Sequence, residues 1–150
     1  MNDFWQRPAA YVIAHDEQAR ILLTQFEIVG HPLSGAWTLP GGGMEWGEQA
    51  HETATRELKE ETGLQGEVGS LLAAQSEWFE ASEAMSGQPG HSIRLIFEGR
   101  IFAGELKKDF CDDDTTVAAA WFALDEVSRL NRVDLVDFAI GLVSTRKIRR

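Results

Sequence analysis

Cysteine is nearly absent from this chain of 150 residues, in which Cys111 is the only one. A single cysteine cannot form an intrachain disulfide, so nothing indicates an oxidising compartment. The neighbouring Asp109, Asp112 and Asp114 disfavour a thiolate, which argues against Cys111 as a catalytic nucleophile. The chain also lacks an apolar run of membrane-spanning length, and its first residues do not resemble a signal or transit peptide. We therefore expect a cytoplasmic protein.

Basic residues are few: 14 Lys and Arg stand against 24 Asp and Glu, which gives a net charge of -10 with His neutral. Such a surface repels RNA, DNA and anionic lipid, so we expect neither bulk nucleic acid nor a membrane as a partner. The same surface repels a nucleotide. A small-molecule substrate that carries phosphate therefore requires bound cations to neutralise its site.

Low-complexity tracts and internal repeats are also missing, and 43% of the residues are hydrophobic, enough for one domain over residues 1–150. Local patterns predict strands at residues 9–14, 20–26, 37–39, 66–73, 77–80, 93–102 and 117–122, and helices at residues 48–62, 123–127 and 133–144. A turn signal at residues 86–92 predicts a long hairpin. This order of elements indicates an α/β fold with a mixed β-sheet between helices.

The most informative stretch is residues 39–64. Pro40 and three successive glycines predict a loop over residues 39–43, whereas residues 48–62 contain no Gly or Pro and are rich in Glu, Ala, Lys and Leu. Gly63 supplies a left-handed stop for this helix. The stretch therefore combines a glycine-rich loop with an acidic helix.

Three glutamates of this helix share one side. Glu57, Glu60 and Glu61 are spaced i, i+3 and i+4, so they fall within an arc of about 100°. A solvated acidic face is the alternative interpretation, but it would expose Ala54 and Leu58 with the glutamates. Clustered carboxylates at a partly buried site need a counter-charge, and Mg²⁺ with its preference for oxygen ligands is a natural one.

The same residues resemble the Nudix box, G-x5-E-x7-R-E-U-x-E-E-x-G-U, in which U is a bulky aliphatic residue. Its fixed positions are filled here by Gly42, Glu48, Arg56, Glu57, Leu58, Glu60, Glu61, Gly63 and Leu64. The resemblance implies the α/β/α sandwich of the MutT-like Nudix hydrolases. It also implies that water cleaves a pyrophosphate bond in a nucleoside diphosphate linked to another moiety, or in a nucleoside triphosphate, with Mg²⁺ or Mn²⁺ as cofactor.

The resemblance also implies roles for single residues. Glu57, Glu60 and Glu61 resemble the metal ligands, and the Gly42 carbonyl a further ligand. Arg56 resembles the residue that orients a catalytic glutamate. Three adjacent glycines, one of them Gly42, also suit a tight turn, which is the alternative interpretation.

The general base is less well defined by the pattern. Glu57 is one candidate, and an acidic residue of a later loop, Asp113 or Asp114, is the other. A solvated loop is the alternative for these aspartates. Glu48 matches the box glutamate near the helix start, and a purely capping role is its alternative.

Candidate substrate contacts lie outside the helix. Trp46, Trp78 and Phe79 are aromatic residues that suit stacking on a base, and Arg7 and Arg94 suit phosphate contacts. Packing in the core or on a strand face is the alternative for each of them.

The substrate and the assembly are the least constrained features. The proline expected near position 79 or 80 of ADP-ribose enzymes is absent, and Gln25 stands where triphosphate hydrolases of the family often carry Arg. A Nudix-fold module that binds nucleotides without turnover is the alternative function, although such a module would be expected to lose box residues. A homodimer is a possible assembly, whereas an EF-hand is excluded by the spacing of oxygen ligands.

Overall fold

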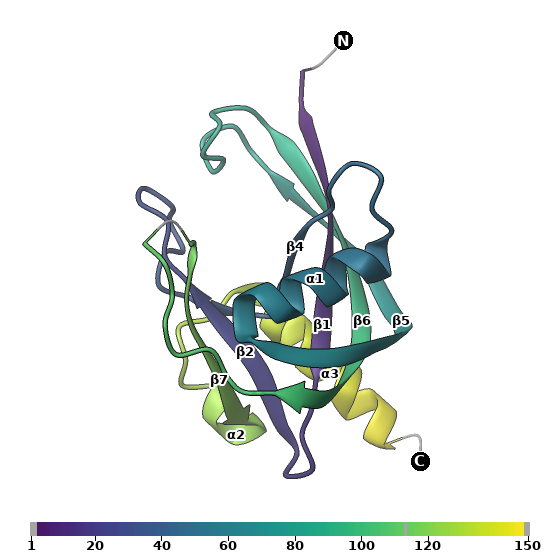
Figure 1. The fold of residues 1–150 in the computed structure, drawn as a ribbon. Helices are drawn as coiled ribbons and strands as arrows, with labels where there is room; N and C mark the ends of the chain where they lie inside the picture. The colour runs from purple at the N-terminus through teal and green to yellow at the C-terminus, as the bar shows by residue number, and fades with distance from the viewer. Residues whose placement is uncertain (1–2, 113, 149–150) are drawn as a thin grey trace.

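A computed structural model describes residues 3–112 and 114–148 (Figure 1). Its elements are β1 (Trp5–Ala14), β2 (Arg20–Phe26), β3 (Trp37–Thr38), β4 (Gly41–Gly43), α1 (Ala50–Thr62), β5 (Leu64–Phe79), β6 (Gly90–Gly104), β7 (Thr116–Ala123), α2 (Leu124–Val127) and α3 (Asp134–Ile148). None of the helices in these ranges has the length and hydropathy needed to cross a membrane.

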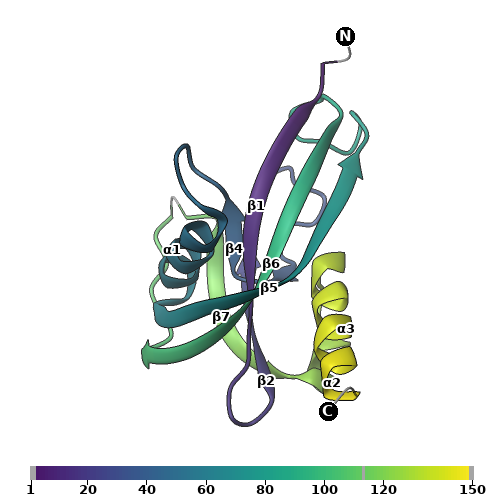
Figure 2. The ribbon, with the colours of Figure 1, turned by 90° about the vertical axis from the view of Figure 1, so that its right-hand side faces the viewer.

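The strands form two sheets, ordered β4-β1-β6-β5 and β3-β2-β7. In the larger sheet β1 and β6 are parallel and the other pairs are antiparallel, so this sheet is mixed. Figure 2 shows α1 and α3 on opposite sides of β1. The predicted α/β fold, with β-structure between helices, is confirmed, and the strands are divided between two sheets.

Residues 9–14 of β1 are buried on both faces of the sheet, which explains the uninterrupted apolar run in this part of the strand. Tyr11 and Ile13 pack into a cluster with α3, while Val12 packs on the other side against Ala54 and Leu58 of α1. Since Ala54 and Leu58 are fully buried, the predicted inward face of the acidic helix is confirmed.

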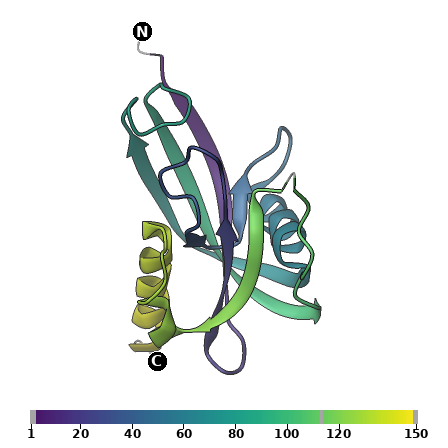
Figure 3. The ribbon, with the colours of Figure 1, turned by 90° about the vertical axis from the view of Figure 1, so that its left-hand side faces the viewer.

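The hairpin of β5 and β6 extends, with the beginning of β1, beyond both helices as an arm (Figure 3). The long hairpin is therefore confirmed, but the two extended segments predicted at residues 66–73 and 77–80 belong to one strand. Register shifts between residues 65 and 73 make the pairing irregular in the first part of this strand, whereas residues 74–76, between the two predicted segments, pair regularly with β6.

The glycine-rich stretch differs most from the prediction, because Gly41–Gly43 form a strand rather than a loop. They pair with β1, and a side chain at Gly41 would place its Cβ 2.3 Å from the Ala10 carbonyl oxygen, with φ at 151°. Pairing with β1 therefore requires glycine here. The helix begins at Ala50 instead of residue 48, and it ends as predicted, with Gly63 at φ 76°.

Candidate active site

Strand β4 lies at the edge of its sheet, so one row of its backbone groups is left unused by β1. The side chains of α1 bind this row. The Gly41 N–H donates to Glu61 Oε1 at 2.7 Å, and Arg56 Nη2 donates to the Gly43 carbonyl at 3.3 Å. The edge strand and the acidic helix therefore form one unit, even though the helix starts seven residues after β4.

Glu57 lies directly against the middle glycine of β4. A Cβ at Gly42 would come 2.8 Å from Glu57 Oε1, too close for any side chain there without displacement. The Glu57 side chain is only 18% exposed. Burial raises its pKa, and the Glu60 charge adds to that rise, while Arg56 opposes it.

Arg56 joins three carboxylates. Its Nε and Nη2 donate to both oxygens of Glu48, at 2.8 and 3.0 Å, in a bidentate pair. Its Nη1 donates to Glu57 at 3.0 Å and to Glu60 at 3.2 Å. The hydrogen bonds that Arg56 donates to Glu48 and Glu57 raise its pKa above the usual value, so the guanidinium stays charged.

Glu48 is a partner of Arg56, and the N-cap residue of the helix, Gln49, makes no side-chain capping hydrogen bond. Besides Arg56, its Oε1 accepts a bond from the Thr53 hydroxyl at 2.5 Å and one from the Glu45 N–H at 3.1 Å. These donors lower the pKa of Glu48 to about 2. The geometry thus favours the ion-pair interpretation of Glu48 over the capping one.

Glu61, in the last turn of α1, is held from two sides. Its Oε1 accepts the bond from Gly41, and its Oε2 accepts one from the Thr116 hydroxyl at 2.7 Å. Burial raises the pKa of Glu61 to about 7, although both hydrogen bonds act in the opposite direction. The negative charges of Glu57 and Glu60 contribute to the rise.

The donor set of α1 fits a divalent cation by its chemistry. Among the described residues, no three His, Cys, Asp or Glu side chains converge as they stand, because the carboxylates are directed at protein donors. Burial nevertheless makes ionised Glu57 and Glu61 costly, and a nearby cation removes that cost. Carboxylate oxygens are the ligands that hard divalent cations prefer.

The late acidic loop lies close to the end of α1. Lys107 Nζ donates to Asp114 Oδ2 and to the Glu60 carbonyl, both at 3.3 Å, and the Lys107 N–H donates to the Thr62 carbonyl at 2.8 Å. Asp114 is therefore tethered near the carboxylates. Asp113, the other predicted base of this loop, lies outside the described residues.

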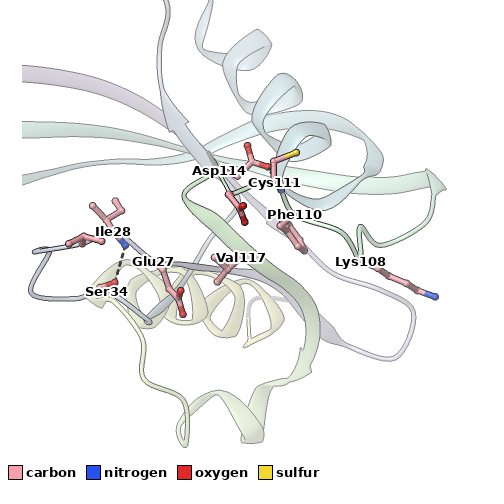
Figure 4. Close-up of a pocket in the computed structure, with 10 residues that line it drawn as sticks. Glu27, Ile28, Ser34, Lys108, Phe110, Cys111, Asp114 and Val117 are labelled. Carbon is pink, nitrogen blue, oxygen red and sulfur yellow. Dashed lines mark hydrogen bonds between the residues drawn. The ribbon is translucent and has the colours of Figure 1, made fainter.

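A groove of about 520 Å³ lies between the loop after β2 and the loop before β7 (Figure 4). Its lining includes Glu27, Ser34, Lys108, Phe110, Asp114 and Val117. Of these residues, only Asp114 was identified from the sequence. The groove is built from two loops that are more than 70 residues apart in the chain, and no local pattern connects them.

Arg7 and Arg94 share the face of the larger sheet that is opposite α1. Ala9 pairs with Arg94, and Arg7 is two residues from Ala9, so the three side chains leave the sheet on the same side. A Cβ at Gly43 would come 3.1 Å from Arg7 Nε. Arg94 pairs with Glu77, and its buried Nε has no hydrogen-bond partner among the described residues.

The three predicted aromatic contacts are separated in space. Phe79 stacks on Trp5, with ring centroids 5.6 Å apart, on the face of Arg7 and Arg94. Trp78 stacks on His91 at 3.8 Å on the opposite face of the arm. Trp46 is fully exposed in the segment between β4 and α1. Thus only Phe79 lies on the same face as the two arginines.

The arrangement of edge strand, glycines and acidic helix agrees with a family comparison. A family model described as the NUDIX domain matches residues 5–139. The chain belongs to the Nudix family. The family resemblance expected from the box is thereby confirmed.

Relatives of this Nudix chain bear different names. It is 37% identical over 101 residues to an "ADP-ribose pyrophosphatase" of Methanocaldococcus jannaschii, an alignment that covers 67% of the chain and 53% of the relative. It is 36% identical over 121 residues to a "putative mutator protein MutT4" of Mycobacterium tuberculosis, covering 79% and 44%. The chain thus matches about half the length of these relatives.

Solved structures confirm the Nudix fold. A "NUDIX hydrolase from Nitrosomonas europaea" has a TM-score of 0.75 and 25% identity, and the match covers 95% of this chain and 91% of that one. A MutT protein from Methanosarcina mazei also has a TM-score of 0.75, at 21% identity, with 98% and 99% covered.

Sequence reasoning missed two groups at the site: the Thr116 hydroxyl, which binds the Glu61 carboxylate, and the Lys107 ammonium, which binds Asp114 and the Glu60 backbone carbonyl. Thr116 is 55 residues from Glu61, so no spacing rule connects them. Lys107 lies shortly before the acidic loop in the sequence. A positive charge at Lys107 followed by a negative charge at Asp114 was the only feature of the sequence that could have suggested their ion pair.

Proposed function

We propose that this Nudix chain hydrolyses a pyrophosphate bond in a nucleoside diphosphate linked to another moiety, or in a nucleoside triphosphate. The observation that carries the proposal is that Glu57 and Glu61 of α1 lie against an edge strand of glycines, while Arg56 joins Glu57 to Glu60. The relatives' names support the same chemistry. They include ADP-ribose pyrophosphatase, 8-oxo-dGDP phosphatase and RNA pyrophosphohydrolase.

Nudix hydrolases generally need divalent metal ions, and we propose Mg²⁺ or Mn²⁺ here. Glu57, Glu60 and Glu61 would hold the ion. A bound divalent cation supplies neutralisation of phosphate oxygens and a lower pKa for water. The cation also offsets the repulsion between an anionic substrate and a protein of net charge -10.

Which residue of β4 could supply a backbone carbonyl as a further metal ligand depends on the direction in which each carbonyl points. The bonds from the Val12 N–H to Pro40 and from the Met44 N–H to Pro8 fix the alternation of the antiparallel ladder. This alternation turns the carbonyl of Gly42 toward β1 and that of Gly41 toward α1. The Gly42 ligand stays a prediction, and the ladder favours Gly41 in that role.

Side chains of this protein carry out the remaining steps of the proposed hydrolysis. Arg56 holds Glu57 and Glu60 in fixed rotamers, because its planar fork is already anchored on Glu48. Glu57, whose pKa is raised, and the tethered Asp114 are the two candidates that take a proton from the attacking water. Neither route requires a covalent enzyme intermediate.

We propose that the bound substrate extends past the edge strand β4 onto the face of the larger sheet that is opposite α1. Arg7 adjoins Gly43 on that face and is suited to phosphate oxygens, whereas Arg94 is paired with Glu77 and its Nε is buried, so its phosphate contact stays a prediction. The Phe79 ring suits a base on the same face. Trp46 and Trp78 stay predictions, as they lie on other surfaces.

A panel of compounds tests the proposed function. Nucleoside diphosphate derivatives, nucleoside triphosphates and simple phosphate monoesters are each incubated with the chain and Mg²⁺ or Mn²⁺, and a phosphatase reveals newly formed monoesters. We expect at least one pyrophosphate compound to be split and the monoesters to stay intact. Cleavage of monoesters alone, or no turnover with either metal, would favour the binding module.

The single domain, the homodimer and the cytoplasmic location stay predictions.

A further inference from the structure

Thr116 is a buried residue outside the Nudix box that reaches into the carboxylate cluster. It is the first residue of β7 and is 6% exposed. Its hydroxyl donates to Glu61 Oε2 at 2.7 Å. A hydroxyl has a single proton to donate, so this bond commits the donor to Glu61.

The position of the Thr116 hydroxyl is fixed by its strand. Thr116 pairs with Phe26 of β2, and the adjacent Thr115 carbonyl accepts the Glu27 N–H at 2.8 Å. A β-branched side chain also has restricted rotation about χ1. The donor is therefore presented to Glu61 from a rigid support.

Glu61 is thereby clamped between the two sheets. Gly41 of the larger sheet binds one carboxylate oxygen, and Thr116 of the smaller sheet binds the other. Each carboxylate oxygen has about two acceptor directions, so one direction on each oxygen stays available. The clamp fixes the plane of the carboxylate and leaves those directions for a ligand.

We propose that Thr116 is a positioning residue that fixes the Glu61 carboxylate for binding a divalent cation, an inference that rests on the proposed function. Groups that orient metal-binding side chains are worth about 10- to 100-fold in metal affinity. Without the hydroxyl, Glu61 keeps only the Gly41 bond and can turn away from the geometry that the two sheets impose. A merely structural Thr116 would affect folding stability and leave metal affinity unchanged.

The test measures Mn²⁺ affinity of the full chain without substrate, by following free Mn²⁺ with electron paramagnetic resonance. Thr116→Val keeps the shape and removes the donor, and Thr116→Ser keeps the donor. We expect about 10- to 100-fold weaker Mn²⁺ binding for the valine variant and recovery to within about threefold for serine. Melting temperatures measured in parallel report folding. If the valine variant does not fold, Thr116→Ala serves as the second donor-free variant, with the same expected loss.

Thr55→Val is the matched control, since the Thr55 hydroxyl donates to the His51 carbonyl of the same helix. It should bind Mn²⁺ as the wild type does. Equal affinity of the wild type and a folded, donor-free Thr116 variant would overturn the inference, even if the panel shows hydrolysis. A weakened variant together with an inactive panel would refute the proposed hydrolysis and support the positioning role. Absence of Mn²⁺ binding by the wild type would also overturn the inference.

Discussion

Replacing Gly42 with alanine tests whether the position of the Glu57 carboxylate matters. The added Cβ would lie 2.8 Å from Glu57 Oε1 and 3.0 Å from its Cδ. Since ordinary contacts begin near 3.4 Å, the carboxylate must move by about 0.6 Å. The movement also disturbs the bond from Arg56 to Glu57, which is 3.0 Å long.

The expected effect of Gly42→Ala on activity is large compared with its effect on stability. A displacement of about 1 Å at a reacting group costs about 100-fold in rate, so we expect kcat/KM to fall by about 10- to 100-fold. The contacted atoms belong to the end of a flexible side chain, which can move without unfolding the strand. We expect the melting temperature to change by less than about 4 °C, equivalent to about 1 kcal/mol.

Gly141→Ala is the matched control, because Gly141 is exposed in α3 and a Cβ there meets no atom within 4 Å. This change should leave kcat/KM unaltered and raise stability by about 0.5–1 kcal/mol through helix propensity. Steady-state kinetics and thermal unfolding of the two variants are compared with the wild type. Full activity of a folded Gly42→Ala variant would refute the reasoning, since the Glu57 carboxylate would then tolerate displacement.

Further changes probe the other groups. Arg56→Lys keeps the charge but loses the planar fork that binds Glu48, so turnover should fall by at least about tenfold. Steady-state kinetics and thermal melting show whether activity falls more than stability. An equal loss of activity and stability would mean that Arg56 has only a structural role. Because the Glu61 pKa is raised from 4.5 to about 7, its contribution to the stability of the metal-free protein is greatest below pH 4.5 and is lost as the pH rises through 7. Urea unfolding at pH 5 and pH 8 should show a loss of up to about 3 kcal/mol from Glu61, and Glu61→Gln should reduce the loss to what remains from Glu57, whose pKa is also raised; an undiminished loss in that variant would contradict the assignment. Phe79→Ala should raise KM more than it lowers kcat; unchanged kinetics would exclude Phe79 from substrate binding.

Local patterns predicted α1 well because its signals lie within a few residues. The i, i+4 spacing of Ala54 and Leu58 gave its buried face, and Gly63 gave its end. The same spacing placed Glu57 and Glu61 together on the inward face, and in the structure both residues meet β4. The start of α1 was less certain, since Glu48 bonds to Arg56 eight residues later instead of capping the helix.

Tertiary contacts decide the features that the sequence could not predict. Glycine has low strand propensity, yet Gly41–Gly43 form a strand because β1 provides pairing partners and tolerates no side chain at Gly41. Likewise, Thr116 meets Glu61 only after the two sheets have packed around α1. Such contacts depend on the folded topology and leave no local spacing to detect.

The most direct test of the central claim is cleavage of the best panel compound, followed by ³¹P NMR, in the wild type and in Glu60→Gln and Glu61→Gln. Both variants keep the side-chain size and remove a negative charge from α1. The account predicts cleavage by the wild type only when Mg²⁺ or Mn²⁺ is added, and a loss of at least about 100-fold in folded variants. Metal-independent cleavage, or undiminished activity in both variants, would contradict a metal-dependent site on α1.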